Sequence, residues 1–349
     1  MDRRKTRTVA LGDLKIGSGS HISVQSMLNK PASDIEASVA QAKALEAAGC
    51  EIIRAAVPDM EAVKLIYALK ENVKAPIVAD IHFDYRLALE SAAAGVDKIR
   101  INPGNIGGDD RVKTVADACR SRNIPIRIGV NSGSVEKDIL AKYGSATAEA
   151  MAESAMYHAA LLEKFDFNDI VISIKSSNVQ RMIEAYRLVA RQCDYPLHLG
   201  VTEAGTYKMG LIKSSVGIGS LLCDGIGDTI RVSLTDDPVK EVAAARDILR
   251  ALDLLENSPQ LVSCPTCGRT KIDLISLANE VEKRLAGCTK AIKVAVMGCA
   301  VNGPGEAKEA DIGIAGGDGC ALIFRKGEII KKVDEASAVD ALMAEIDKL

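Results

Sequence analysis

Three cysteines in the last third of the chain have the spacing of an iron–sulfur site. Cys264 and Cys267 form a Cys-Pro-Thr-Cys motif, and Cys299 begins a glycine-rich segment that runs to Glu306. Three thiolates and a weaker oxygen ligand can hold a cluster while one iron stays open to substrate and acts as a Lewis acid. The residues alone leave the fourth ligand open, because the thiols of Cys288 or Cys320 could replace the Glu306 carboxylate.

A Cys-x-x-Cys pair also occurs in zinc sites and in thioredoxin-like proteins, and both fit this chain less well. A zinc ribbon needs a second closely spaced pair, whereas Cys299 is isolated. A thioredoxin-like pair opens a helix after a strand, whereas a short, proline-interrupted segment precedes Cys264. We interpret the cysteines in predicted barrel helices or at their ends as small buried apolar residues. These are Cys50, Cys119, Cys193 and Cys223.

A second set of reactive side chains depends on a predicted barrel. Short apolar runs rich in β-branched residues alternate with longer stretches of helical period, which is typical of βαβ units. Eight such runs predict a closed (β/α)8 barrel of the TIM type. The runs are 21–27, 52–57, 77–83, 98–102, 125–130, 169–175, 197–203 and 229–234.

Polar side chains lie at or near the carboxyl ends of these runs, which form the active-site mouth of such a barrel. Five of them are cations on different runs, and the fork of a guanidinium matches phosphate oxygens. We therefore predict a small substrate that carries more than one phosphate group. The residues concerned are Arg54, Asp80, His82, Arg100, Asn102, Arg127, Asn131, Lys175, Glu203, Arg231 and Ser233.

Length and composition set the domain organisation. A chain of 349 residues can hold a barrel of about 250 residues and a further domain. We place the substrate-binding barrel at 1–257 and a small α+β iron–sulfur domain at 258–349. A formal charge of −3 and 3% aromatic residues argue against nucleic-acid binding. No secretion signal or long apolar stretch is found, so we expect a cytoplasmic protein without a membrane partner.

Long motifs from nearly the whole chain resemble the 4-hydroxy-3-methylbut-2-en-1-yl diphosphate synthases of the methylerythritol phosphate route to isoprenoids. They lie at 77–86, 100–107, 124–131, 196–205 and 225–234 and in both cysteine motifs. The chain is most similar to the two-domain bacterial form. The resemblance implies reductive opening and dehydration of 2-C-methyl-D-erythritol 2,4-cyclodiphosphate to 4-hydroxy-3-methylbut-2-enyl diphosphate.

The resemblance also implies a cofactor, partners and site residues. A 4Fe-4S cluster would be bound by Cys264, Cys267, Cys299 and Glu306, which favours Glu306 over the two other thiols. Electrons would come from a flavodoxin or ferredoxin, and in a homodimer the partner's cluster domain would cap the barrel mouth. Glu203 and Glu306 would be catalytic, with Glu203 as acid or proton relay. The substrate contacts would be Arg54, Arg100, Asn102, Arg127, Asn131, Lys175, Arg231 and Ser233.

Two other functions are compatible with parts of the pattern. Lys175, among other cations, could form a Schiff base in a cofactor-free lyase. Alternatively, the C-terminal part could be a zinc-stapled interaction module beside an inert barrel.

Overall fold

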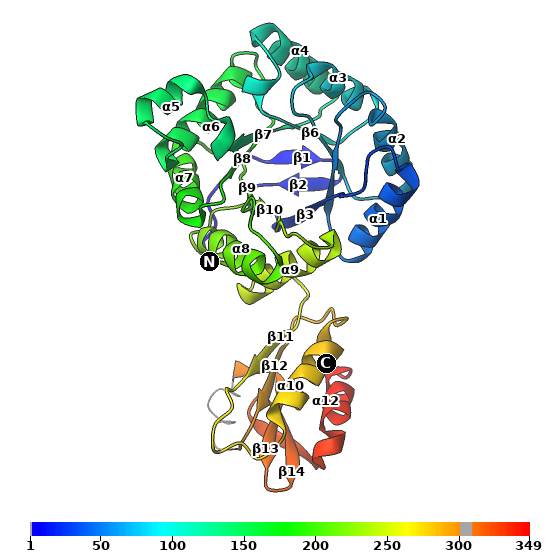
Figure 1. The fold of residues 1–349 in the computed structure, drawn as a ribbon. Helices are drawn as coiled ribbons and strands as arrows, with labels where there is room; N and C mark the ends of the chain where they lie inside the picture. The colour runs from blue at the N-terminus through cyan, green and yellow to red at the C-terminus, as the bar shows by residue number, and fades with distance from the viewer. Residues whose placement is uncertain (1, 301–308) are drawn as a thin grey trace. The chain divides into compact units, whose positions relative to one another are not determined.

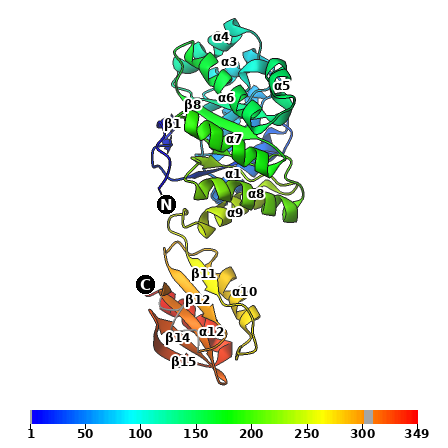
Figure 2. The ribbon, with the colours of Figure 1, turned by 90° about the vertical axis from the view of Figure 1, so that its left-hand side faces the viewer.

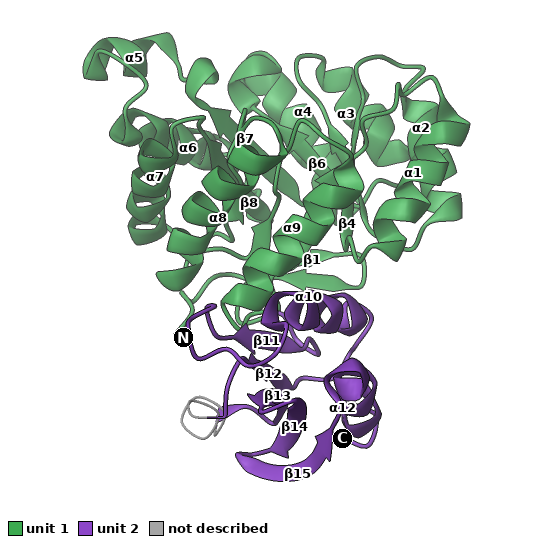
Figure 3. Ribbon diagram, turned by 60° about the horizontal axis from the view of Figure 1, so that its bottom comes forward, with its two compact units in different colours: residues 1–254 green, residues 255–349 purple. Residues whose placement is uncertain are grey.

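The computed structural model describes residues 2–300 and 309–349, so the predicted ligand Glu306 lies outside the described residues. Contacts divide the chain into two compact units, residues 1–254 and 255–349 (Figure 3). The predicted boundary after residue 257 falls just inside the second unit. Which function each unit carries stays a prediction.

The first unit is a parallel barrel, as predicted. Its strands neighbour one another in chain order, β10 pairs with β3, and a bridge between Ile172 and Leu197 joins the two ends of the sheet. Figure 1 shows this ring with the helices around it. The strands are β3 (Ser23–Met27), β4 (Ile52–Ala56), β5 (Ile77–Asp80), β6 (Lys98–Ile101), β7 (Ile126–Asn131), β8 (Ile170–Lys175), β9 (His198–Leu199) and β10 (Thr229–Ile230).

Amphipathic helices cover the outside of the barrel. In α7 (Val179–Gln192), Met182, Ala185, Tyr186 and Val189 are buried at helical spacing, and the Asn178 side chain caps the first turn by accepting a hydrogen bond from the Arg181 amide. The other barrel helices are α1 (Ile35–Ala47), α2 (Val63–Asn72), α3 (Tyr85–Ala93), α4 (Asp109–Arg120), α5 (Lys137–Tyr143), α6 (Ala148–Glu163), α8 (Tyr207–Cys223) and α9 (Pro238–Ala251).

An antiparallel hairpin, which the sequence analysis missed, closes one end of the barrel. Its strands, β1 (Val9–Leu11) and β2 (Leu14–Ile16), have three residues each, too few to show a periodicity. Their apolar side chains pack against the amino-terminal parts of β4, β5 and β8, through Ile52, Val78 and Val171. Figure 2 shows the hairpin at one end of the barrel. Apolar packing fills the amino-terminal end, which leaves the carboxyl end for polar chemistry.

In its described residues the second unit is a mixed five-stranded sheet with two α-helices, which confirms the predicted α+β fold. Strands β11, β12 and β13 are parallel, and β14 and β15 continue antiparallel. Helices α10 (Leu274–Leu285) and α12 (Ala338–Ile346) share an apolar core with the sheet. The sequence analysis missed β11, which is short and half-buried. The strands are β11 (Gln260–Ser263), β12 (Lys293–Met297), β13 (Ile312–Gly317), β14 (Cys320–Arg325) and β15 (Glu328–Val333).

Among the described residues, no helix has the length and apolarity to cross a lipid bilayer.

Candidate active site

Five cations from five different barrel strands or their ends come together inside the barrel. Burial lowers the pKa of the Lys175 ammonium well below its usual range, and repulsion from the four arginines lowers it further. Arg127 has no solvent-exposed surface, Arg100 and Lys175 are buried, and Arg54 and Arg231 are partly buried. The cluster, which we call the cation cluster, consists of Arg54, Arg100, Arg127, Lys175 and Arg231.

A single carboxylate bridges two members of the cation cluster. Asp80 Oδ2 lies 3.2 Å from Arg54 Nη2, and Asp80 Oδ1 lies 3.2 Å from Arg100 Nη1. Burial alone would raise the pKa of the Asp80 carboxyl, but Arg54 and Arg100 outweigh burial and hold this pKa well below its usual range. Burial lowers the pKa of Arg54 to about 10, with Asp80 opposing the shift. His82 Nε2, 3.5 Å from Asp80 Oδ2, adds a fourth group to this arrangement.

The register of the sheet explains why these side chains meet. Asp80, Arg100 and Arg127 are direct neighbours on three adjacent strands, β5, β6 and β7. A side chain on Gly129 would collide with the guanidinium of Arg100, whose Nη2 donates to the Gly129 carbonyl at 3.3 Å. The absence of a side chain at Gly129 therefore makes room for Arg100 in the lumen.

The cation cluster has more hydrogen-bond donors than acceptors. Arg127 Nη1 donates to Gln25 Oε1 at 3.1 Å, but Arg127 Nε and Nη2 are buried without a partner. The Nε atoms of Arg54 and Arg231 are also buried and unpartnered. In the described part of the chain, two carboxylates, Asp80 and Glu241, face five cations. Unsatisfied buried donors are costly, so an anionic ligand with several acceptors fits this place.

Two supporting residues of the cluster escaped the sequence analysis. Glu241, on α9, lies 3.6 Å from Arg231 Nη2, accepts from Ser26 Oγ at 3.1 Å and from the Leu234 amide at 2.9 Å. Gln25 lies within β3 and holds Arg127. A sequence signal existed for Glu241, because it shares the buried helical face of Val242, Ala245 and Ile248. A glutamate at such a position needs a buried partner.

The other predicted site residues lie at the end of a strand or in the loops beyond the strands. Asn131 is half-buried at the end of β7, and Ser233 is half-buried beyond β10. Asn102 is buried, and both ends of its amide have protein partners, Ser134 Oγ at 3.2 Å and the Gly104 amide at 3.1 Å. Glu203 is exposed and has a φ of 51°, one of seven positive φ values among the described non-glycine residues.

Two expectations about position are wrong. Arg127 is the second residue of β7 and not near its carboxyl end, and its long side chain is held deep in the lumen by Gln25. Cys223, expected to be buried, is exposed, because it is the last residue of α8 and lies beyond the packed face of that helix. Cys50 and Cys119 are buried as predicted, and Cys193 is partly buried.

Cys264 and Cys299 of the second unit lie at the same edge of its sheet. Cys264 directly follows β11, and Cys299 follows the neighbouring parallel strand β12 by two residues. The Gly298 amide donates to Cys264 Sγ at 3.1 Å. Cys267 is exposed, and the amide and side chain of Arg269 lower the pKa of its thiol. We call this the cysteine edge.

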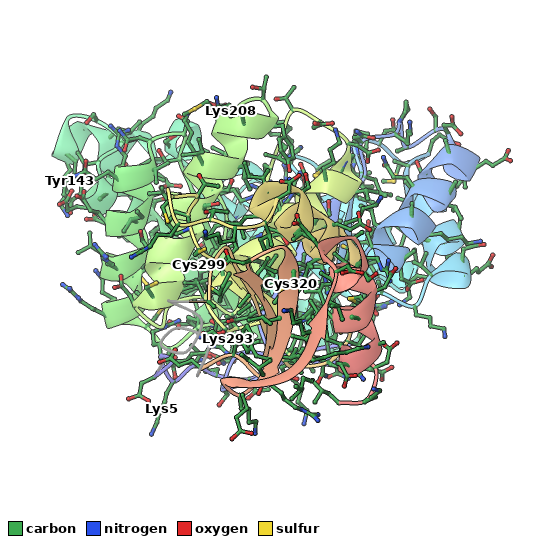
Figure 4. The ribbon with its side chains drawn as sticks, turned by 90° about the horizontal axis from the view of Figure 1, so that it is seen from below. Lys5, Tyr143, Lys208, Lys293, Cys299 and Cys320 are labelled. Carbon is green, nitrogen blue, oxygen red and sulfur yellow. The ribbon has the colours of Figure 1, made fainter. Side chains whose placement is uncertain are left out.

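The topology separates the two alternative thiols. Cys320 pairs with Gly317 where β13 ends and β14 begins, so it lies at the same edge of the sheet as Cys264 and Cys299. Figure 4 labels Cys299 and Cys320. Cys288 precedes β12 and packs against the apolar core, at the opposite edge. Within residues 2–300 and 309–349, no three His, Cys, Asp or Glu side chains are grouped closely enough to hold a metal ion.

Comparisons with known proteins agree with this architecture. Residues 6–246 match the family model described as the GcpE TIM-barrel domain, and residues 260–348 match the GcpE protein C-terminal domain. Solved structures of dihydropteroate synthase share the barrel fold. The Thermus thermophilus protein has a TM-score of 0.53 at 14% identity, over 71% of this chain and 99% of that one, and the Yersinia pestis protein has a TM-score of 0.51 at 15% identity, over 70% and 98%.

Curated relatives match over the full length. A protein of Clostridium acetobutylicum is 61% identical over 100% of both chains, and one of Clostridium perfringens is 57% identical over the same coverage. A protein of Geobacillus thermodenitrificans is 56% identical over 99% of this chain and 93% of its own. All three are named 4-hydroxy-3-methylbut-2-en-1-yl diphosphate synthase (flavodoxin). These matches confirm the predicted family and enzyme class: the chain belongs to the GcpE family.

Proposed function

We propose that this chain converts 2-C-methyl-D-erythritol 2,4-cyclodiphosphate to 4-hydroxy-3-methylbut-2-enyl diphosphate, with the cation cluster as the diphosphate site and the cysteine edge as the cluster site. The observation that carries this assignment is the excess of buried, unpartnered guanidinium donors in the barrel. A cyclic diphosphate offers several charged acceptors in a small volume, which matches that excess.

We assign direct substrate contacts to side chains that are buried in the lumen and to hydrogen-bond donors that have no protein partner. Arg54, Arg100, Arg127, Lys175 and Arg231 would take the phosphate oxygens, with Asn131 and Ser233 at the rim. Because burial and cationic neighbours lower the pKa of Lys175, an anionic ligand would favour its charged form. Asn102 is a further proposed substrate contact at the mouth, although both ends of its side-chain amide already have protein partners.

The thiols of the cysteine edge fit an iron–sulfur cluster. Cys264 and Cys299 end adjacent parallel strands, Cys267 lies on the loop between β11 and α10, and the Gly298 amide already donates to a sulfur, as backbone amides do around cluster thiolates. We assign a 4Fe-4S cluster to Cys264, Cys267, Cys299 and Glu306. When bound, it would supply electrons one at a time and a Lewis-acidic iron for the departing oxygen.

Glu203 is the proposed acid or proton relay. Its side chain is exposed in the loop after β9, at the carboxyl end of that strand, where active-site residues of a barrel lie. Glu306 is the second proposed catalytic residue.

Partners follow from the reaction and the relatives' names. A reductive ring opening needs two electrons, and flavodoxin appears in those names, so we assign a flavodoxin or a ferredoxin as donor. We further propose a cytoplasmic homodimer in which the partner's cluster unit meets the barrel mouth. This arrangement would bring the substrate cations and the cluster together although they lie in different units of one chain.

The test compares Arg100→Ala with Arg86→Ala in anaerobically reconstituted holoenzyme. Arg100 is buried against Asp80, whereas Arg86 is an exposed arginine that pairs locally with Asp84. Loss of a charge-assisted hydrogen bond of about 1.5–3 kcal/mol should weaken binding of the cyclodiphosphate by about 10- to 100-fold in Arg100→Ala. Arg86→Ala should bind like the wild type. Equal affinities in the two variants would refute the diphosphate site.

The same preparation tests the cluster and the two rival functions. Iron and acid-labile sulfide should be present in equal amounts, with turnover dependent on a reduced donor. Zinc without sulfide would favour the interaction module, and borohydride trapping of a carbonyl substrate on Lys175 would favour the lyase. In Glu306→Ala, turnover should fall far more than substrate affinity.

A further inference from the structure

One serine joins the two loops that follow β6 and β7. Ser134 is the last residue of the short helix η2 (Ser132–Ser134). Its hydroxyl accepts from Asn102 Nδ2 at 3.2 Å and from the Asn131 amide at 3.1 Å, and it donates to the Asn131 carbonyl at 3.1 Å. Its own amide donates to the Asn131 side chain. Ser134 therefore contacts both asparagines of the two loops.

Asn102 passes this constraint to the next loop segment. Its Oδ1 accepts from the Gly104 amide at 3.1 Å, within the short helix η1 (Pro103–Asn105). The Asn102 side chain is buried, so its two hydrogen bonds are protected from competition with water. The position of Gly104 is thereby linked to Ser134 through a single amide group.

Gly104 packs against a close contact between a buried histidine and a half-buried glutamate. His158 of α6 has no exposed surface, and its Nε2 lies 2.6 Å from Oε1 of Glu136, the residue before α5. A Cβ on Gly104 would lie 2.9 Å from His158 Cε1 and 3.2 Å from Glu136 Oε1. The backbone at Gly104 therefore packs directly against this pair, too closely for any residue with a Cβ atom.

We propose that Ser134 is a positioning residue for substrate binding. We further propose that the Glu136–His158 pair fixes the position of the loop around Gly104, to which Ser134 is linked through Asn102. The inference rests on the proposed function, in which Asn131 at the mouth contacts the diphosphate. With the Asn131 carbonyl, main-chain amide and side-chain oxygen all engaged by Ser134, the side-chain nitrogen is the group left to donate to a phosphate oxygen. A preorganised donor binds its anion without a further ordering cost.

The first test removes the hydroxyl. In Ser134→Ala holoenzyme, the dissociation constant for the cyclodiphosphate should rise about three- to tenfold while kcat stays within about twofold, since about one net hydrogen bond is lost. Ser134→Thr, which keeps a hydroxyl, should restore the affinity. Ser132→Ala is the matched control, because Ser132 lies in the same short helix and its hydroxyl has no partner among the described residues.

The second test disrupts the packing of Gly104 against His158 and Glu136. Gly104→Ala should raise the same dissociation constant, because the new methyl group meets His158. Gly108→Ala is its control, since Gly108 ends the same loop with an ordinary φ of −70° and open space around it. Melting temperatures separate a folding defect from the predicted loss of affinity, because misfolding lowers the active fraction and leaves the affinity of the remaining enzyme unchanged.

The outcomes distinguish this inference from the proposed function. If Arg100→Ala weakens substrate binding but Ser134→Ala and Gly104→Ala bind like the wild type, the positioning role is wrong and the diphosphate site stands. If Arg100→Ala also binds normally, the diphosphate site is wrong and the positioning role falls with it.

Discussion

In the barrel unit the charged side chains stand on strands inside a closed lumen, whereas in the second unit the cysteines stand beyond the ends of strands. Arg100 and Arg127 occupy paired positions of adjacent strands, and Asp80 and Gln25 hold them in place. Cys264 and Cys299 follow β11 and β12, and the exposed Cys267 lies further along a loop. The residues of the barrel site hold one another through ion pairs and hydrogen bonds, whereas the cysteine edge, in the proposed function, would be completed by its iron–sulfur cluster.

This difference has a physical cause. Buried cations require a fixed set of partners, so the strands that carry them must be rigid in the absence of ligand. Thiols of a cluster site become mutual neighbours through the inorganic core, and the binding free energy of that core stabilises the surrounding loops. Changing a residue of the cysteine edge should therefore leave the barrel site intact, whereas changing a residue of the barrel site should destabilise the barrel itself.

The largest effect is expected for Cys264→Ser. The cluster should be lost and turnover abolished, because a cluster thiolate is replaced by a poor iron ligand. If the barrel site is independent, this variant should still bind the cyclodiphosphate with an affinity within a few-fold of the wild type. Iron and sulfide analysis and anaerobic calorimetry measure the two properties, with the exposed barrel thiol variant Cys223→Ser as control. If Cys264→Ser loses substrate affinity as well as the iron–sulfur cluster, the barrel site is not independent of the cysteine edge.

An intermediate effect is expected for Asp80→Asn. Removing the carboxylate leaves Arg54 and Arg100 buried without their counter-charge, which should lower the free energy of unfolding by about 3–5 kcal/mol. Urea unfolding followed by circular dichroism measures it. Asp84→Asn, at an exposed pair with Arg86, should cost less than about 1 kcal/mol. Similar losses of unfolding free energy in both variants would show that Asp80 does not stabilise the cation cluster.

The pH dependence sharpens the same prediction. The pKa of Asp80 is depressed in the folded protein, so its contribution is fully present above the unfolded pKa of about 3.9 and is lost as pH falls through the folded value. The stability difference between wild type and Asp80→Asn should thus be constant near neutral pH and shrink below about pH 4.

The smallest effects are expected for the two remaining thiols of the second unit. Cys288→Ser changes a side chain that packs at the opposite edge of the sheet, and Cys320→Ser changes a nearly buried thiol beside Gly317. Both should keep full iron and sulfide content and turnover if Glu306 is the fourth ligand. Because Cys320 lies at the cysteine edge, loss of iron in this variant alone would replace Glu306 by Cys320 in the ligand set.

Much of the architecture was determined by local sequence pattern. The eight barrel strands alternate with helices because β-branched runs and helical periods alternate along the chain, and both patterns act over short distances. The same holds for the Cys-Pro-Thr-Cys motif, whose two cysteines are three positions apart in the chain whatever the fold. The hairpin β1–β2 and the strand β11 escaped because segments of three or four residues carry too little pattern to be distinguished from loops.

The tertiary structure decided which polar groups share a charge environment. Gln25, Glu241 and Ser134 have no sequence signal that joins them to Arg127, Arg231 and Asn102, since these contacts depend on strand register and helix docking. Likewise, Cys288 and Cys320 offer the same thiol ligand, and only the fold separates them, because Cys288 precedes β12 whereas Cys320 begins β14 at the cysteine edge. Residue types indicate the chemistry, but a contact such as that between Gln25 and Arg127, 102 residues apart, forms only when the barrel closes.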